Sequence, residues 1–168
     1  MGHENTNRPR MTPQLRAVRD ADLRVIWTNL RDPEASWMAA FGTRDASFEA
    51  FAERWQKNAS EGTTLSRSIV VDGTVVGFVA RFLRDGRPEV TYWVAREHWG
   101  QGIATAALRA LLELERTRPL YASAAQDNAR SLRVLTACGF VVTGSERAFA
   151  DARGEEIDEV FLEIRGSD

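Results

Sequence analysis

The chain has 168 residues, 43% of them hydrophobic and 27% charged, which is typical of one folded domain with a single core. Its net charge of −2 argues against a disordered chain and a nucleic-acid partner, and no apolar run reaches the ~18 residues that cross a membrane. Cys138 is the single cysteine and His3 and His98 are the only histidines, so an internal disulfide is excluded and we expect no metal site.

The N-terminal part is predicted to be mainly helical. Residues 1–13 are polar and aperiodic, which predicts a flexible lead-in to one domain over 14–168. Apolar residues then recur at helical spacing in two stretches, and Pro33 either ends the first of them or begins a further piece. The elements expected here are a short strand over 14–18, a helix over 20–30, and a helix from residue 48 that Ser47 caps.

Three antiparallel strands are predicted next. Asp72 and Gly73 separate two β-branched runs, and this dipeptide suits a two-residue hairpin turn because both positions take positive φ. A second turn over 85–88 leads into the third run. The strands are expected over 67–71, 74–82 and 89–94.

Helices and strands alternate in the remaining chain. The pattern predicts helices over 102–116 and 128–138, and strands over 119–124, 140–143 and 157–164. Such alternation produces right-handed crossovers between parallel strands, whereas the last strand closes the sheet antiparallel. The expected fold class is therefore α/β (mixed α+β), with a central mixed sheet of six or seven strands and flanking helices.

The strand-to-helix junction over 89–105 is the most informative segment. Its strand ends in a short loop, and Gly100 and Gly102 open the next helix. The N–H groups of a first helical turn have no acceptor within the helix and lie at the positive end of its dipole, and glycines let oxygens approach the backbone. The junction predicts a phosphate site, although two glycines could also make only a tight turn.

Two known phosphate loops fit this junction poorly. A P-loop needs a lysine after its glycines, and none lies nearby. The dinucleotide fingerprint needs a third glycine or alanine where Thr105 stands, and the strands upstream are predicted to be antiparallel. Asp127 could act as the ribose-binding acid, so a dinucleotide-binding enzyme stays as a weaker alternative.

Two sequence blocks resemble a known family. The first reads Tyr92-Trp93-Val94 and then Trp99-Gly-Gln-Gly-Ile-Ala-Thr105, and the second reads Asn128-Ala-Arg-Ser-Leu-Arg-Val-Leu135 with Gly139-Phe140 behind it. Together they resemble the GNAT superfamily of acetyl-coenzyme A-dependent N-acetyltransferases, in particular its branch of ribosomal-protein N-terminal acetyltransferases. The similarity is clearest over residues 75–140.

The resemblance implies a GNAT-like sheet in which the strands over 89–94 and 119–124 splay apart and admit the pantetheine arm of acetyl-coenzyme A. A backbone N–H near Val94 would polarise the acetyl carbonyl, and the amides of residues 99–105 would hold the diphosphate. The cofactor contacts that the resemblance implies come from Trp93, Val94, Trp99, Gly100, Gln101, Gly102, Ile103, Ala104, Thr105, Asn128 and Ser131.

Acetyl transfer to an amine needs a group that takes up a proton, because most amines are protonated at pH 7. Glu89 is the predicted base, and strand alternation places it on the face opposite Tyr92. It could equally be a solvated residue at the start of its strand. His98 also titrates near neutrality, but we expect it to be a surface residue.

The departing thiolate of coenzyme A needs a proton as well. Many family members use a tyrosine at the position of Leu135, so their usual acid is missing here. The resemblance suggests Ser131 as the donor, directly or through water, although it could be only a first-turn residue of a helix that Asn128 caps. Cys138 lies in an apolar helix end without a histidine partner, which favours a core thiol over a nucleophile.

The predicted function is transfer of an acetyl group from acetyl-coenzyme A to a primary amine, of a protein N-terminus or of a small molecule, by direct attack in a ternary complex in the cytoplasm. The alternative is a GNAT-like module that binds or senses coenzyme A without turnover. The acceptor and the oligomeric state, monomer or homodimer, are not encoded in any motif. Four aromatic residues could line an acceptor site or belong to the core: Trp27, Trp37, Phe41 and Trp55.

Overall fold

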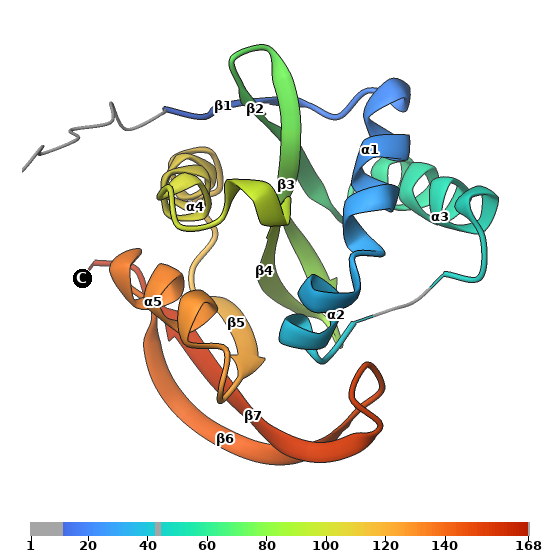
Figure 1. The fold of residues 1–168 in the computed structure, drawn as a ribbon. Coiled ribbons are helices and arrows are strands. Elements are labelled where there is room, and N and C mark those ends of the chain that lie inside the picture. Colours follow the sequence, from blue (N-terminus) through green and yellow to red (C-terminus); the bar gives the residue numbers. More distant parts are fainter. Residues whose placement is uncertain (1–11, 43–44, 168) are drawn as a thin grey trace, which may run out of the picture.

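A seven-stranded mixed sheet forms the centre of the structure, a computed structural model that describes residues 12–42 and 45–167 (Figure 1). Most of the predicted lead-in falls outside these residues. The strands are β1 (Gln14–Ala17), β2 (Leu65–Val71), β3 (Thr74–Arg84), β4 (Arg87–Val94), β5 (Leu120–Ala125), β6 (Val141–Ala150) and β7 (Glu155–Ile164). The helices are α1 (Asp20–Leu30), α2 (Pro33–Ala39), α3 (Phe48–Ser60), the short 3₁₀ helix η1 (Arg96–His98), α4 (Ile103–Leu114) and α5 (Ala129–Ala137).

The sheet has the strand order β1-β2-β3-β4-β5-β7-β6. Neighbours from β1 to β4 are antiparallel, whereas β4 and β5 run parallel and share a single registered pair, Glu89 with Tyr121. β7 lies between β5 and β6 and is antiparallel to both. The predicted α/β class with a mixed sheet is confirmed, and the sheet opens between β4 and β5.

Apolar cores cover both faces of this sheet. α4 and α5 pack on one face, where Leu108, Leu111 and their neighbours are buried, and α1 and α3 cover the other (Figure 1). Ile26 of α1 and Phe51 of α3 are buried there against Phe78 of β3. Burial of one such side chain stabilises a fold by ~1.5–3 kcal/mol, so the helices on both faces hold the sheet in place.

β4 takes part in both cores. Val90 and Val94 belong to the core beneath α4 and α5, while Trp93 packs with the core beneath α1 and α3. Successive side chains of a strand point to opposite faces, so Glu89 lies on the α1/α3 face and Tyr92 on the α4/α5 face. This is the alternation that the sequence predicts.

The predicted β-hairpins are confirmed with small changes at their ends. Asp72 and Gly73 take φ values of +49° and +77°, as a two-residue turn requires. The second turn consists of Asp85 and Gly86 alone, with φ values of +50° and +76°. β4 therefore begins at Arg87, two residues earlier than expected.

Other elements differ more from their prediction. β6 continues to Ala150, whereas the prediction ends it at residue 143. It is an edge strand whose side chains are mostly exposed, so its sequence lacks the apolar alternation by which a strand is recognised. α2 has only seven residues, too few for a periodic signal, but Pro33 stands at its first position and Asp32 caps it by accepting from the Ala35 N–H at 3.0 Å. α4 ends at Leu114, two residues early.

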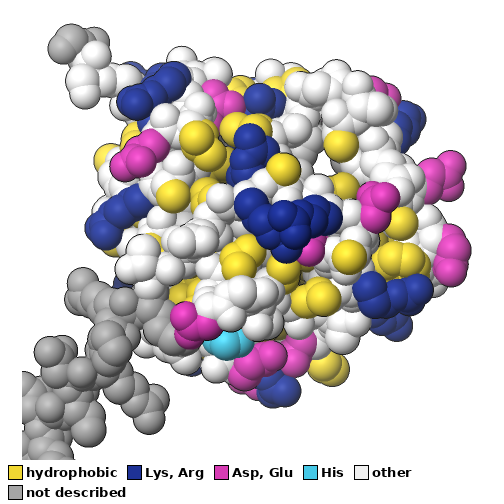
Figure 2. All heavy atoms as spheres, turned by 90° about the horizontal axis from the view of Figure 1, so that it is seen from above, with side chains coloured by type: hydrophobic (Ala, Val, Ile, Leu, Met, Phe, Trp, Pro, Cys, Tyr) yellow, Lys and Arg dark blue, Asp and Glu magenta, His cyan; other side chains and the backbone are white. Residues whose placement is uncertain are grey.

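The outer surface carries charges of both signs. On the face in Figure 2, basic and acidic side chains are interspersed, with small apolar areas between them. This agrees with the nearly balanced net charge of the chain. Among the residues that the structure describes, no helix has the length and apolar character needed to cross a membrane.

Candidate active site

A cavity of about 990 Å³ has walls on both faces of the sheet. On the α4/α5 face the walls include Gly102 and Asn128, and on the α1/α3 face they include Phe41 and Trp55. β4 and β5 line the cavity between these two ends. A molecule that enters beside α4 can therefore reach the opposite face through the opening between the two strands.

Backbone amides of β4 face this opening. The N–H of Ala95 donates to the carbonyl of Val76, on the β3 side, at 2.8 Å. Neighbouring residues of an antiparallel strand direct their N–H groups to opposite sides, so the N–H groups of Tyr92 and Val94 point away from β3. β5 has diverged from β4 at this level, which leaves these two amides facing the cavity.

The loop before α4 has the geometry of an anion site. Gly100 and Gly102 take φ values of +75° and +76°, a region that side-chain-bearing residues avoid. A Cβ at either position would meet no atom within 4 Å, so conformation and not crowding requires the glycines. The first helical amide to find an acceptor in this turn is that of Ala106, bonded to the carbonyl of Gly102. The three amides before it lie at the positive end of α4.

The backbone N–H of Trp99 forms a hydrogen bond within the loop and is not available to a ligand. It donates to the carbonyl of Arg96 at 3.1 Å, and the indole Nε1–H donates to the carbonyl of Val94 at 2.8 Å. The guanidinium of Arg130 stacks over the indole, 4.6 Å from the ring centre. Trp99 therefore holds the loop in shape and contributes a ring, not an amide, to the site.

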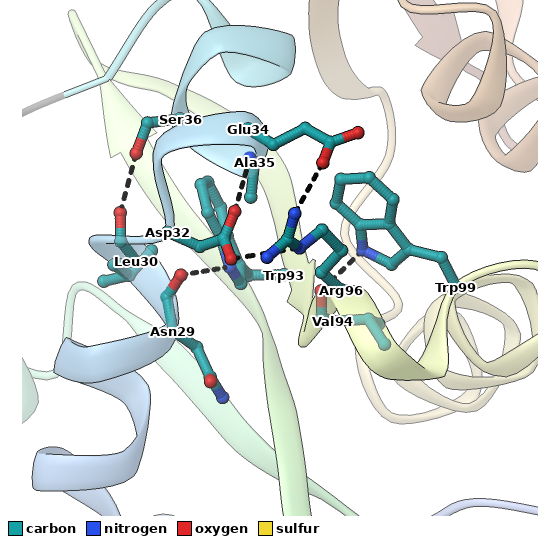
Figure 3. A network of polar contacts seen from close by, with 10 residues as sticks. All are labelled: Asn29, Leu30, Asp32, Glu34, Ala35, Ser36, Trp93, Val94, Arg96 and Trp99. Atoms are coloured by element: carbon teal, nitrogen blue, oxygen red, sulfur yellow. Dashed lines mark hydrogen bonds and ion pairs between the residues drawn. The ribbon is translucent and has the colours of Figure 1, made fainter.

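Polar contacts also tie the end of β4 to α1 and α2 (Figure 3). Arg96 forms ion pairs with Glu34 at 2.6 Å and with Asp32 at 3.2 Å. Trp93 donates its indole N–H to the carbonyl of Asn29 at 3.2 Å. These contacts join the end of β4 and the loop after it to α1 and α2.

Ser131 lies beside Tyr92 on the α4/α5 face. The two hydroxyl oxygens are 2.6 Å apart, and the phenol also lies 3.1 Å from the carbonyl of Ser131. Burial raises the pKa of Tyr92 well above its ordinary value of 10, which outweighs the opposing hydrogen bond from Ser131. The phenol therefore stays protonated. Its single proton is donated either to the carbonyl of Ser131 or to Oγ, and the serine proton is free to point elsewhere only when the phenol donates to Oγ.

Asn128 caps α5, as predicted. Its Oδ1 accepts from the Ser131 N–H at 3.2 Å, so Ser131 is the N3 residue of the helix. Its Nδ2 donates to the carbonyl of Met38 at 3.2 Å. The Asn128 side chain thus positions Ser131 and connects the end of α2 to the start of α5.

Glu89 lies on the other face of the sheet. Its side chain is 12% exposed, and its Oε2 is 3.3 Å from Nε of Arg84. Burial is the main cause that raises the pKa of Glu89, the Arg84 charge lowers it in part, and the Glu159 charge raises it further. Glu89 pairs in register with Tyr121, where β4 and β5 still meet, and it is not among the residues that line the cavity. A carboxylate whose pKa is raised holds a proton more readily than an ordinary glutamate.

The structure gathers the predicted residues into two groups. Val94, Gly100, Gly102, Asn128 and Ser131 line the α4/α5 end of the cavity. Gln101 and Glu89 are not among the lining residues, and Glu89 lies on the α1/α3 face. Sequence reasoning missed Tyr92 as a partner of Ser131. Strand alternation placed Tyr92 on the correct face, but only the packing of α5 brings the two hydroxyls together.

Three further candidates differ in their surroundings. His98 is half-buried: it lines the cavity, and its Nδ1 is buried without a hydrogen bond among the described residues, so its ring lies at the cavity wall while the residue stays partly exposed. Cys138 packs against the core and burial raises its pKa, in line with a core thiol. Asp127 is held by both terminal nitrogens of Arg153, at 2.6 and 2.8 Å, which leaves it poorly placed to bind a ribose.

The four aromatic candidates divide between core and cavity. Trp27 packs with the core beneath α1 and α3, and Trp37 is 47% exposed. Phe41 and Trp55 line the cavity, and Trp55 also packs edge-on against Phe78. Two of them therefore contribute apolar surface to the α1/α3 end of the cavity.

The mixed sheet opens at a parallel pair, with a glycine loop and a helix N-terminus beside the opening, which is the arrangement that the resemblance to acetyl-coenzyme A-dependent N-acetyltransferases implies. Residues 14–141 match the model of the family described as "Acetyltransferase (GNAT) domain", and the chain belongs to this family. It is 28% identical over 128 residues to "Putative ribosomal N-acetyltransferase YdaF" of Bacillus subtilis, a match that covers 71% of this chain and 69% of that protein.

Solved structures share the fold across nearly the whole chain. Spermidine N-acetyltransferase from Vibrio cholerae, in complex with CoA and spermine, superposes with a TM-score of 0.80 at 20% identity, over 92% of this chain and 95% of that one. Ribosomal-protein-alanine N-acetyltransferase from Brucella melitensis gives a TM-score of 0.79 at 22% identity, over 91% and 99% of the two chains. At these identities the comparison supports the fold.

Proposed function

We propose that this protein transfers the acetyl group of acetyl-coenzyme A to a primary amine by direct attack in a ternary complex. The observation that carries the proposal is the cavity with walls on both faces of the sheet. An acyl donor held beside α4 and an amine held beside α1 and α3 meet in such a cavity without a covalent enzyme intermediate. Family membership and relatives named as N-acetyltransferases support the same reaction.

The donor is assigned to the α4/α5 end. The free first-turn amides and the positive φ of both loop glycines suit the diphosphate of coenzyme A. The Vibrio protein is described in complex with CoA, which supports this class of ligand for the present chain. The residues assigned to the donor are Val94, Trp99, Gly100, Gln101, Gly102, Ile103, Ala104, Thr105, Asn128 and Ser131. Trp93, which the resemblance also implies, packs with the core beneath α1 and α3 and is not assigned to the donor.

The reaction assigns one role to each catalytic group. Glu89 accepts a proton from the acceptor ammonium, directly or through water, which frees the nitrogen lone pair. The amine nitrogen then bonds to the acetyl carbon while the Val94 N–H stabilises the negative charge on the carbonyl oxygen. As the carbon–sulfur bond breaks, the nitrogen releases its second proton to solvent, and Ser131 donates a proton to the thiolate and regains one from solvent. The products are an N-acetyl amide and free coenzyme A.

The acceptor is a primary amine of a protein N-terminus or of a small molecule. The Bacillus relative is named "Putative ribosomal N-acetyltransferase YdaF", and the Vibrio structure contains spermine. Both classes carry a primary amine with a pKa above or near neutrality. The apolar wall of Phe41 and Trp55 is suited to the carbon chain that carries it.

Release of free thiol tests the proposal. The protein is incubated with acetyl-coenzyme A and a panel of amines and N-terminal peptides, and thiol is measured with a colorimetric reagent. Saturable release with at least one acceptor is expected. Saturable binding of acetyl-coenzyme A with no release for any acceptor would instead support the binding or sensing module, whose basis is Leu135 at the position where many relatives carry tyrosine.

A further inference from the structure

Glu159 is a buried carboxylate that the proposed reaction does not use. It lies on β7, and only 8% of the residue is exposed. Its Oε1 is buried and accepts no hydrogen bond among the described residues. The nearest cation is the Nη1 of Arg84, at 3.6 Å, which is too long for a hydrogen bond.

The same guanidinium also faces Glu89. Arg84 Nε lies 3.3 Å from Glu89 Oε2, so one cation stands between two buried carboxylates. Both contacts are longer than the ~2.7–2.9 Å of a charge-assisted hydrogen bond. By contrast, Arg153 holds Asp127 at 2.6 and 2.8 Å. Arg84 therefore satisfies neither glutamate fully, and the group retains a net negative charge.

Arg84 connects this group to the α1/α3 end of the cavity; Glu89 and Glu159 are not among the lining residues, so a ligand reaches them only where Arg84 gives way. Arg84 and Phe82 of β3 line the cavity, and Phe82 pairs directly with Glu89 across the strands. The side chain of Arg84 is 45% exposed, so it has access to solvent when another cation takes its place between the two carboxylates. The other nearby charges are Asp85 and Arg87, and Arg87 is stacked 3.8 Å over the ring of Tyr121.

We propose that Glu159 and Glu89 form a binding site for an acceptor with two positive charges, in which an ammonium group takes the place of the Arg84 guanidinium. The reacting amine faces Glu89, and the second cation binds Glu159. This inference rests on the proposed function and names its substrate class. A compact ammonium with three donors can satisfy the free Oε1 of Glu159, and a buried carboxylate without a hydrogen bond favours such a ligand strongly.

Binding measured without turnover provides the first test. Calorimetric titration in the presence of free coenzyme A compares three amines of equal length: 1,4-diaminobutane, 4-amino-1-butanol and 4-aminobutanoate. The diamine is expected to bind at least tenfold more tightly than the alcohol, and the amino acid more weakly than both. Equal affinity of the diamine and the alcohol would overturn the inference, whether or not acetyl transfer occurs.

Three substitutions test which side chains bind the diamine. Glu159→Gln should weaken diamine binding about tenfold and leave the alcohol unchanged, while Glu163→Gln on the same strand, ion-paired with Arg165 at 2.6 Å, should change neither. Arg84→Met removes the competing cation and should tighten diamine binding, a gain that a misfolded protein cannot show. An unchanged or weaker affinity of Arg84→Met for the diamine contradicts the site.

Kinetics separate this inference from the proposed function and distinguish two sources of the second charge. KM for the diamine is compared with KM for N-terminal peptides that carry lysine or norleucine at position two. A lower KM for the diamine indicates a small polyamine-like acceptor, and a lower KM for the lysine peptide indicates a basic protein terminus.

If all acceptors are acetylated with KM values unaffected by the second charge, the cation site is wrong and the acetyltransferase stands. If the diamine binds but nothing is acetylated, the cation site stands and the acetyltransferase is wrong.

Discussion

The hydroxyl oxygens of Tyr92 and Ser131 lie 2.6 Å apart, although 39 residues separate them along the chain. The contact joins the opened edge of β4 to the first turn of α5. Asn128 fixes Ser131 from the other side through its cap. A hydroxyl held in this way can donate a proton without reorganising, which is the requirement for an acid that assists thiolate departure.

Replacement of Ser131 tests this role. Ser131→Ala is expected to lower kcat by a factor of roughly 10², because the thiolate loses its donor, while the Kd for acetyl-coenzyme A changes less than threefold. Tyr92→Phe should have a smaller effect on kcat, since the serine proton remains. The control is Thr136→Val on the same helix, where the hydroxyl bonds only to the backbone. A wild-type kcat for Ser131→Ala would leave Ser131 as an ordinary first-turn residue.

Replacement of Glu89 tests the base. Only the ionised carboxylate accepts a proton, and the pKa of Glu89 is raised chiefly by burial. kcat/KM for an amine is therefore expected to rise with pH through a limb that lies above the usual range of glutamate. Glu89→Gln should remove that limb and lower kcat, with acetyl-coenzyme A affinity preserved. A second limb near the pKa of the acceptor amine should remain in both proteins.

The pH dependence of kcat/KM must be measured with two acceptor amines that have different pKa values. The acceptor limb should move with the amine, and the Glu89 limb should stay in place. Glu163→Gln on β7 provides the matched carboxyl-to-amide control. Identical profiles for the wild type and Glu89→Gln would remove Glu89 from the mechanism.

The glycine loop is tested by one strained substitution. Gly102→Val places a β-branched residue at a φ of +76°, which such residues adopt only at a cost of ~1–3 kcal/mol, and the loop is expected to rearrange. Acetyl-coenzyme A should then bind at least tenfold more weakly in a calorimetric titration. Gly154→Val imposes comparable strain at a φ of +66° in the β6–β7 turn, far from the loop in sequence, and should leave the affinity unchanged. Equal loss in both variants would contradict the anion site.

Most of the fold could be predicted because its signals are local. The helical spacing of Leu23 and Ile26 and the turn at Asp72 and Gly73 depend on neighbours within one element. β6 was predicted too short because its exposed side chains carry no burial pattern. α2 was not recognised as a helix, since its evidence is one cap and one proline.

The site could be predicted only in part, for a related reason. The glycine loop and Glu89 lie within one continuous segment, so their relation to each other follows from the strand and the turn. The Tyr92–Ser131 contact and the Glu89–Arg84–Glu159 group each join separate elements. Their geometry depends on how α5 and β7 pack against β4, and no periodicity in the sequence encodes that packing.

Asp22 provides a stability prediction away from the site. It accepts from Arg16 at 2.6 and 3.0 Å, from the Arg19 N–H at 2.8 Å and from Ser68 at 2.8 Å. The Arg16 hydrogen bond is the main cause that lowers the pKa of Asp22 to about 2, from an ordinary 3.8. Because the folded pKa is the lower one, ionised Asp22 stabilises the fold above pH 3.8, by about 2 kcal/mol, and this contribution is lost as the pH falls toward 2.

Asp22→Asn should therefore lower the free energy of unfolding by about 2–4 kcal/mol at pH 7, measured by urea denaturation. The difference between wild type and variant should shrink when both are measured at pH 3, because part of the wild-type carboxylate contribution has been titrated away. Arg16→Met should show the same pH dependence through the same pair. A difference that stays constant between pH 7 and pH 3 would show that the introduced amide destabilises the fold for steric reasons, and that the charge of Asp22 contributes nothing to stability.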